Sequence, residues 1–507
     1  MRRKPYPVIG LTGGLDTSVD PAFLSDIASP NVDNVRFHKG LVKKEFGFIA
    51  HGDANERVML FDTYTQYDGT VYPMCVTVDK AYRWVSNAWS AVSGAGAVFT
   101  GDEDDRFESA TMNDLWIVTN AKDVVKEWNG SVWANLGGLA TVNVTTVQTM
   151  AAFYSHFVIA NITEGGNLLT SRVRWSDTGD PEDWNTGTAG AMDIVDTPGG
   201  ILTLKIIRDR LFAFKTDSVW EIVYVGGTTV FEPRLILDVG IRCGGSVVTF
   251  GNTSAAMFTD GFFTFDGLYR EDIGKQVYPL LFETESTKVH WEVIGRAQAA
   301  YVEETGEYVI CLPEGQDEPQ TIYKMSTRGK SWSKYSPSGA ITCFGQRSED
   351  VGMTWTEAKA LGTKWDNAYW DFSWKNFSVP VGTYSLLGGA TDGRTVEDNR
   401  STISPLELVF ETKDFIMGHS VRWKYVVAVV RGIILQMQFS TDQGLSWSVP
   451  KVFSPDPDKF SECIMELGVT GMHMRFRLTS SSGPFALRWV EPTYIERKRS
   501  RKFIRGA

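Results

Sequence analysis

The stretch RVRWSDTGDPEDWN, residues 172–185, is the best guide to the fold of this chain. An apolar strand leads to the first indole, Trp175, a Gly-Asp-Pro turn reverses the chain, and a second indole, Trp184, ends the loop. These turn residues fit because Gly accepts unusual backbone angles, Asp bonds nearby amides and Pro fixes φ. We interpret the stretch as a hairpin connection whose two tryptophans clamp the turn, without a catalytic role.

The same unit of strand, polar turn, second strand and frequent closing Trp recurs along the chain. Copies lie within residues 58–92, 114–136, 153–185, 202–231, 247–269 and 299–335. A period of roughly 40–50 residues is typical of four-stranded propeller blades, whose radial closure protects strand edges. Residues 384–397 are a candidate for a seventh blade or a closing strand. The pattern predicts an all-β chain with a β-propeller of about six blades; a pair of β-sandwiches is the alternative.

The regions outside the repeat differ from it and from each other. Gly13-Gly14, Pro21 and Pro30 interrupt the N-terminal region, which indicates an extended arm. Longer strands near the C-terminus alternate apolar with charged residues, as in 474–478, which predicts a half-buried antiparallel sheet and a C-terminal β-sandwich. The predicted regions are an extended arm at 1–54, propeller blades at 55–336, a loop or hairpin insertion with propeller closure at 337–404, the β-sandwich at 405–495 and a basic tail at 496–507.

Composition narrows the class of protein. The 17 Trp, 29 Phe and 48 Gly of the 507 residues favour many short strands joined by tight turns. The formal net charge of −11 argues against a general nucleic-acid binder. The five cysteines are widely spaced, which predicts reduced, buried thiols. The absence of an apolar leader after the basic start predicts a protein made in the cytoplasm without export.

Charge is distributed unevenly along the chain. Arg2, Arg3 and Lys4 open it, and a dense group of cations closes it: Arg497, Lys498, Arg499, Arg501, Lys502 and Arg505. Such a run either contacts phosphates or an acidic partner, or it is a solvated or subunit-docking tail.

A second motif lies in residues 440–447, STDQGLSW, which matches the SxDxGxxW pattern of Asp-boxes in sialidases and other propellers. In the turn that contains Gly444, Asp442 is expected to bond backbone amides while Trp447 packs beneath, so the motif predicts a folding device. A propeller glycosidase is the enzyme alternative, with Asp102, Glu103, Asp104 and Asp105 as its clustered carboxylates. The Arg-Ile-Pro signature of sialidases is missing, so we expect no enzyme activity.

Metal and cofactor sites are not predicted. The six histidines show no paired ligand spacing, and no phosphate-binding loop or nucleophile elbow is present. Asp177, Asp180 and Asp183 could turn inward around a calcium ion. Carboxylates in turns more often bond backbone amides, which is the interpretation we prefer.

Three segments together resemble one protein family. GGLDTSVDP at 13–21, followed by DNVR at 33–36 and Gly40, is similar to the N-terminus of tail nozzle and hub proteins of short-tailed bacteriophages, although KKEFG at 43–47 departs from the family's usual Arg-Pro-Gly or Arg-x-Gly. ETKDF at 411–415, with RWK at 422–424, resembles the start of the family's C-terminal β-domain. The loop 172–185 resembles the family's GDP-containing loop, through Arg172, Arg174, Trp175, Gly179, Asp180, Pro181 and Trp184.

The resemblance implies a structural component of the virion tail. Proteins of this family form a ring, typically a hexamer, below the portal and adaptor, continue the DNA channel and retain the packaged genome. It implies as partners further copies of the chain, the adaptor and portal proteins, tail fibres or spikes, and the double-stranded DNA in transit. A sialidase-like glycosidase or a carbohydrate-binding propeller acting on host glycans is the alternative function.

Overall fold

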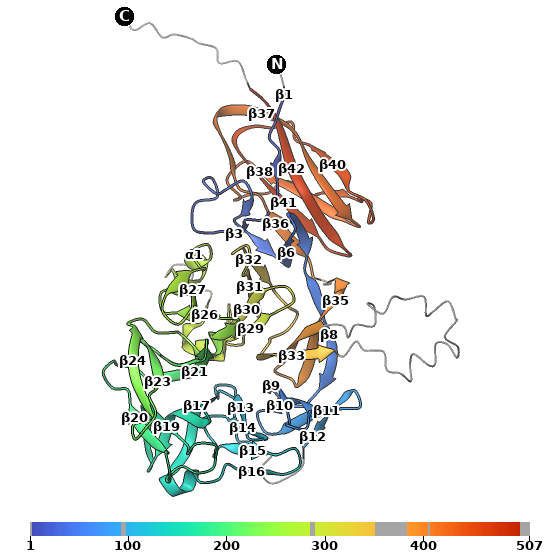
Figure 1. Cartoon of the computed structure of the whole chain (residues 1–507). Coiled ribbons are helices and arrows are strands. Elements are labelled where there is room, and N and C mark those ends of the chain that lie inside the picture. The colour runs from blue at the N-terminus through green and yellow to red at the C-terminus, as the bar shows by residue number, and fades with distance from the viewer. Residues whose placement is uncertain (1–2, 93–97, 284–288, 350–382, 404–405, 497–507) are drawn as a thin grey trace, which may run out of the picture.

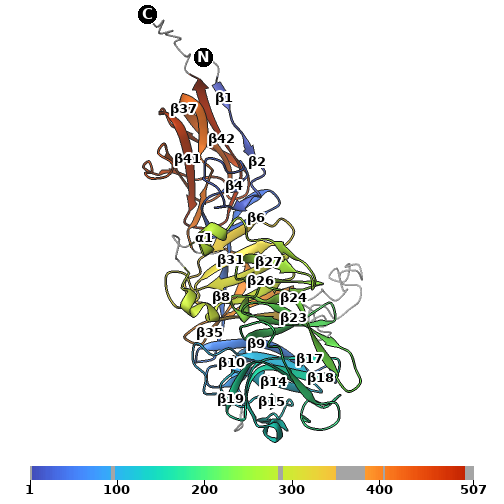
Figure 2. The same cartoon turned by 90° about the vertical axis from the view of Figure 1, so that its left-hand side faces the viewer.

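A computed structural model describes residues 3–92, 98–283, 289–349, 383–403 and 406–496. The protein consists of a seven-bladed β-propeller and a β-domain attached to its rim (Figure 1). Seen from the side, the β-domain continues the molecule away from the edge of the propeller (Figure 2). Both ends of the described chain lie in this β-domain.

Six blades follow the repeat in the sequence, each as a four-stranded antiparallel meander. Tight hairpins permit this, many with central residues at positive φ, as at Asn113-Asp114. Their strands are β9 Val58–Thr65, β10 Val71–Thr77, β11 Ala81–Val85 and β12 Ala88–Ala91; β13 Glu108–Met112, β14 Leu115–Thr119, β15 Lys126–Trp128 and β16 Trp133–Asn135; β17 Val144–Phe153, β18 His156–Glu164, β19 Asn167–Trp175 and β20 Gly190–Asp193; β21 Ile201–Ile207, β22 Arg210–Lys215, β23 Val219–Tyr224 and β24 Phe231–Leu237; β25 Val248–Phe250, β26 Thr253–Phe258, β27 Gly261–Phe265 and β28 Arg270–Asp272; β29 Gln298–Val302, β30 Glu307–Leu312, β31 Thr321–Ser326 and β32 Trp332–Tyr335.

The seventh blade closes the ring with strands from both ends of the chain. Its strands are β33 Cys343–Glu349, β34 Thr383–Gly389 and β35 Arg394–Ile403, and its fourth is β8 Phe46–Asp53 from the N-terminal region. Strand β8 runs antiparallel to β35, with Arg394 opposite Asp53. The blade number is therefore seven, and the segment 384–397 belongs to a complete blade. Residues 350–382 of the predicted insertion lie outside the described residues.

The β-domain is built on one hydrogen-bonded network of twelve strands. Seven come from the C-terminal region: β36 Leu408–Glu411, β37 Phe415–Gly432, β38 Leu435–Ser440, β39 Lys451–Phe453, β40 Ser461–Glu466, β41 Thr470–Ser480 and β42 Phe485–Glu496. Five come from the N-terminal region: β1 Arg3–Pro5, β2 Val8–Ile9, β5 Val32–Asp33, β6 Val35–His38 and β7 Leu41–Lys44. The region predicted as an arm is thus folded onto its own chain up to Lys44, and then enters the seventh blade.

The β-domain and the propeller rim share one apolar core. Leu15 of the short pair β3 Gly14–Leu15 and β4 Ala28–Ser29, Trp332 of blade 6, and Trp423 of β37 belong to the same buried cluster. A Cβ on Gly14, whose φ is +75°, would come within 2.8 Å of the Trp332 backbone nitrogen. Only glycine fits this close approach. The shared core fixes the two parts against each other, because separating them would expose these side chains to water.

Helical structure is minor. The helix α1 spans Tyr278–Phe282, and 3-10 turns span Leu139–Val142, Gly244–Ser246 and Trp291–Arg296. Within the described ranges, no helix has the length and apolar character needed to cross a bilayer.

Candidate functional sites

The motif loop, residues 176–189, connects β19 to β20 at the outer side of blade 3. It is tied at both ends, because the Asp177 amide donates to the Asp183 carbonyl at 2.7 Å and the Gly179 amide to the Ser155 carbonyl at 2.6 Å. Gly179 has a φ of +78°, as the turn requires, and Pro181 is buried. The Asp180 carboxylate accepts the Glu182 amide at 2.9 Å. These bonds form a turn in which the polar residues bind neighbouring backbone groups.

The two tryptophans of the motif lie in different cores. Trp175 packs with residues of blades 3 and 4, with its ring centre 5.2 Å from that of Phe231, and its Nε1 donates to the Thr188 carbonyl at 2.9 Å. Trp184 is 1% exposed and packs between blades 2 and 3, beside Phe157. Each indole therefore packs at a different blade interface. The sequence predicted that the two tryptophans clamp the turn, and in the structure their contacts involve three blades.

The motif arginines are held by carboxylates of the same blade. Arg172 binds Asp193 with two nitrogens, both at 2.7 Å, and Glu164 at 3.1 Å. Arg174 binds the other oxygen of Glu164 at 2.8 Å. The hydrogen bond to Asp193 outweighs burial and raises the pKa of Arg172. Both guanidinium groups are engaged within blade 3, so their role in this structure is to pin β18, β19 and β20 together.

The candidate calcium ligands point to turn amides. Asp177 accepts the amide of Thr188 at 2.7 Å, and Asp183 accepts the amides of Asn185 and Thr186 at 3.2 and 3.1 Å. The bonds from Thr188 lower the pKa of Asp177. Over the described ranges, no group of three or more His, Cys, Asp or Glu could hold a metal ion.

Glu127, on β15, faces the loop and was missed by sequence reasoning. Its Oε2 is buried without a hydrogen-bond partner in the described structure. Burial, assisted by the nearby charge of Glu182, raises the pKa of Glu127 to about 7. The neighbouring Gly138 lets the loop approach, since a Cβ there would lie 1.7 Å from the Glu182 carbonyl oxygen. Adjacent Gly137-Gly138 was the available sequence signal for this contact.

We predict that Glu127→Gln makes the protein more stable at pH 8 than the parent and leaves it nearly unchanged at pH 5. A folded-state pKa above the ordinary 4.5 means that the folded protein keeps the proton while the unfolded chain releases it. Stability is therefore lost as pH rises from about 4.5 to about 7, by about 1–2 kcal/mol after allowance for solvent screening. Melting temperatures of both proteins at the two pH values test this; a pH-independent difference would contradict it.

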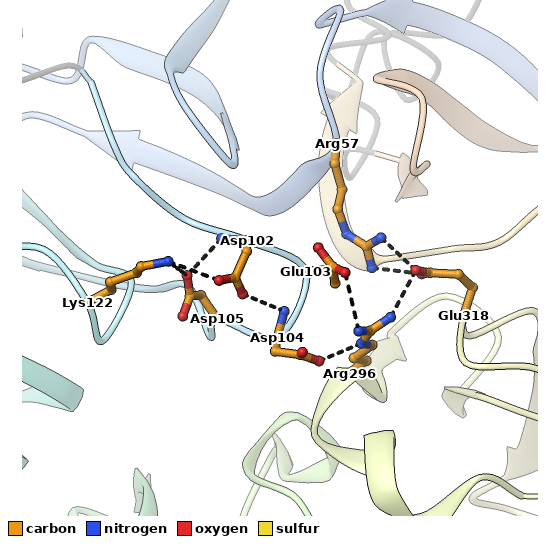
Figure 3. A network of polar contacts seen from close by, with 8 residues as sticks. All are labelled: Arg57, Asp102, Glu103, Asp104, Asp105, Lys122, Arg296 and Glu318. Atoms are coloured by element: carbon orange, nitrogen blue, oxygen red, sulfur yellow. Dashed lines mark hydrogen bonds and ion pairs between the residues drawn. The ribbon is translucent and has the colours of Figure 1, made fainter.

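The acidic run 102–105 is part of a charge network that ties blades 1, 2 and 6 together (Figure 3). Arg57, before β9, binds Glu318 with two nitrogens at 2.8 and 2.7 Å. Arg296 reaches Glu318 at 3.0 Å and Asp104 at 2.7 Å. The network therefore joins loops that are far apart in the sequence. It acts in addition to strand β8, which closes the ring of blades.

The other carboxylates of this run are also paired. Asp102 and Asp105 lie 2.9 and 3.5 Å from Lys122, and Glu103 lies 3.7 Å from Arg296. The glycosidase alternative would assign two of these carboxylates to acid and nucleophile, whereas each one here forms an ion pair. These ion pairs join the loop 102–105 to Lys122 and Arg296.

A buried ion cluster lies deeper, between the first strands of blades 2 and 4. Glu108 is 7% exposed and contacts Lys205 at 3.1 Å, Arg106 at 3.4 Å and the Thr203 hydroxyl at 3.0 Å. Burial opposes ionisation of Glu108, but Lys205 and Arg106 together lower its pKa to about 2. The sequence did not predict this cluster, because its residues come from two regions, the start of β13 and β21, that are far apart along the chain.

The Asp-box lies in the β-domain, between β38 and β39. Asp442 accepts the Ser446 amide at 3.0 Å, while the Ser440 hydroxyl donates to Asp442 at 2.6 Å and accepts the Gly444 amide at 2.8 Å. These bonds from Ser440 and Ser446 lower the pKa of Asp442 to about 2. Trp447 is half-buried, and the Arg477 guanidinium covers its ring at 4.0 Å from the centre. The Trp therefore packs under an arginine, and the motif acts as a folding device.

Two further sets of residues were predicted from the sequence: buried thiols and a basic partner contact. The five cysteines are free and buried. The predicted partner-contact residues Arg497, Lys498, Arg499, Arg501 and Lys502 lie outside the described residues.

No protein-family model and no curated protein matches this chain. Solved structures similar to it include the extracellular domain of a hybrid two-component system from B. thetaiotaomicron, at 8% identity and a TM-score of 0.42, with 75% of this chain and 43% of that chain covered. BamB from Moraxella catarrhalis is 12% identical at a TM-score of 0.38, with 79% and 98% covered. An exo-β-1,3-galactanase from Phanerochaete chrysosporium is 8% identical at 0.25, with 86% and 100% covered. Identities and scores this low carry no information about function.

Proposed function

We propose that this chain is a structural protein of a short phage tail, a subunit of the nozzle or hub ring below portal and adaptor. In this role it continues the DNA channel, retains packaged DNA and lets it pass during ejection. Its partners are further copies of the chain in a ring of the hexameric kind, the adaptor and portal proteins, fibres or spikes, and the DNA. We infer that the β-domain is a sandwich whose two layers are joined through β37 and β41.

One observation carries the proposal: the segment 411–415 meets in space the N-terminal region that contains the resembling stretches 13–21 and 33–36. The Glu411 amide donates to the Asn31 carbonyl at 3.1 Å, and the Asp414 amide donates to the Pro21 carbonyl at 3.0 Å. Lys413 pairs with Asp26 at 2.6 Å. Segments almost 400 residues apart therefore build one joint, as expected if the residues that carry the resemblance act together in the fold.

The second resembling segment also has a supporting role. The motif loop is secured to three blades through Trp184 and the adjoining Trp175, and the preceding arginines of β19 bind within blade 3. A subunit that transmits force along a tail benefits from rigid joints of this kind, because a loop with few buried contacts opens locally at little cost.

Imaging the phage particle tests the proposal. Antibodies raised against the expressed chain are expected to label the tip of the tail, and particle reconstruction is expected to place the propeller and β-domain in a ring there. Labelling of peripheral fibres or spikes, or absence from purified particles, would refute the tail-conduit role. The same antibodies applied to tail-less capsids are the control, and they should not label them.

A further inference from the structure

A group of basic side chains, which we call the basic face, lies on the β-domain next to its seam with the propeller. It consists of Lys39, Lys43, Arg431 and Arg488, on the β6–β7 turn, β7, β37 and β42. Lys43 is paired with Ala486 of β42, and Ala486 with Arg431 of β37. Directly paired residues face the same side of a sheet, so Lys43 and Arg431 lie on one face about 10 Å apart, two strand spacings.

The arginines are held in place by an aromatic ring. The guanidinium carbons of Arg431 and Arg488 lie 5.4 and 5.5 Å from the centre of the Phe460 ring. Stacking uses the flat face of a guanidinium and leaves its N–H edge available for an oxygen ligand. The loss of side-chain freedom on binding is correspondingly reduced.

These four cations are crowded together. Over the part of the chain that the structure describes, none of the four forms an ion pair, whereas propeller cations such as Arg57, Arg210 and Arg296 do. Burial and then the charges of Arg36, Arg431 and Lys39 lower the pKa of Lys43. The local field is therefore positive in a protein whose net charge is −11.

We propose that the basic face contacts the phosphate backbone of double-stranded DNA. The inference rests on the proposed function, because a tail conduit brings the duplex to the subunit. Guanidinium forks and lysine ammonium groups are the usual phosphate ligands of proteins. The chain as a whole is acidic, so we expect the contact through this face to be independent of sequence and sensitive to salt. A contact of this kind binds a duplex weakly and allows it to slide past the subunit.

A second copy of the chain is the competing occupant, since acidic side chains outnumber basic ones in its propeller. Phosphates fit the basic face better. Ala486, between Lys43 and Arg431, is small and 3% exposed, so this row offers charge with little apolar area. The centre of a protein interface is usually richer in apolar surface.

Binding of the full chain to a fluorescent duplex of about 30 base pairs, followed by anisotropy from 50 to 200 mM salt, tests the proposal. Lys43→Glu/Arg431→Glu is expected to weaken binding at least tenfold at low salt and to reduce the salt slope by about 2. Lys39→Glu/Arg488→Glu changes two exposed positions and provides a second pair where folding is less at risk. Lys80→Glu/Lys330→Glu is the matched control, with the same charge change on exposed propeller lysines, and is expected to retain binding.

The proposal is overturned if the parent chain does not bind the duplex at 50 mM salt, or if the control pair weakens binding as much as the basic-face pairs. Sedimentation velocity on the same proteins identifies the competing occupant. Loss of self-association with DNA binding unchanged would assign the face to a second copy. A tail-tip location by imaging together with any of these negative results would leave the tail role intact and remove only the DNA contact.

Discussion

Glu411→Ala is expected to destabilise the β-domain by about 3–5 kcal/mol, the cost of breaking a buried ion pair from one side. The Glu411 side chain is 3% exposed and binds Arg475 at 2.5 Å and Arg477 at 2.8 Å. It also accepts a hydrogen bond from the Asn31 amide group at 3.0 Å. Its removal leaves the Arg475 charge, 9% exposed, without its carboxylate and removes the side-chain hydrogen bond from Asn31 across the joint.

Thermal unfolding followed by circular dichroism, with limited proteolysis at 25 °C, measures this effect. We expect a lower first transition and early cleavage near the joint in Glu411→Ala. Glu496→Ala is the matched control, because it breaks an ion pair with Lys4 in which both side chains are nearly half exposed, and should change little. Equal behaviour of the two variants would show that the Glu411 cluster does not hold the joint.

The blades were predictable from the sequence because each one is local. Strand, turn and strand follow each other within 40–50 residues, so the six units could be recognised without knowledge of distant contacts. The seventh blade required a strand from residues 46–53, whose partner β35 starts at Arg394. Nothing in the sequence of β8, FGFIAHGD, identifies a partner so far away, and the region therefore looked like the end of an arm.

In the β-domain, the alternation of apolar and charged residues does not by itself predict which charged side chains are buried. The pattern at 474–478 correctly puts Met474, Phe476 and Leu478 in the core. It also suggests that Arg475 faces water, yet this side chain is largely buried against Glu411. The carboxylate that covers it comes from another strand, and pairings of this kind are set by the tertiary fold. The motif loop was predictable as a turn, whereas the half-buried Glu127 beside it was not.

Trp184→Ala is expected to lower the free energy of unfolding by about 3–5 kcal/mol, as for other large aromatic side chains removed from a core. Trp184 is 1% exposed and fills the interface between blades 2 and 3, so alanine would leave a cavity there. Trp175 fills the next interface, and its alanine variant should be similarly destabilised. Both variants should lower the midpoint of urea unfolding.

The phenylalanine variants separate packing from hydrogen bonding. The Trp175 Nε1 donates to the Thr188 carbonyl, whereas the buried Trp184 Nε1 has no hydrogen-bond partner in the described structure. Trp184→Phe therefore loses only volume, while Trp175→Phe also leaves a carbonyl without its donor, at a cost of about 1 kcal/mol more. We expect Trp184→Phe to unfold at a higher urea concentration than Trp175→Phe. The opposite order would mean that the two indoles do not anchor the motif loop in the way that their contacts indicate, and that the loop is held mainly by its turn amides.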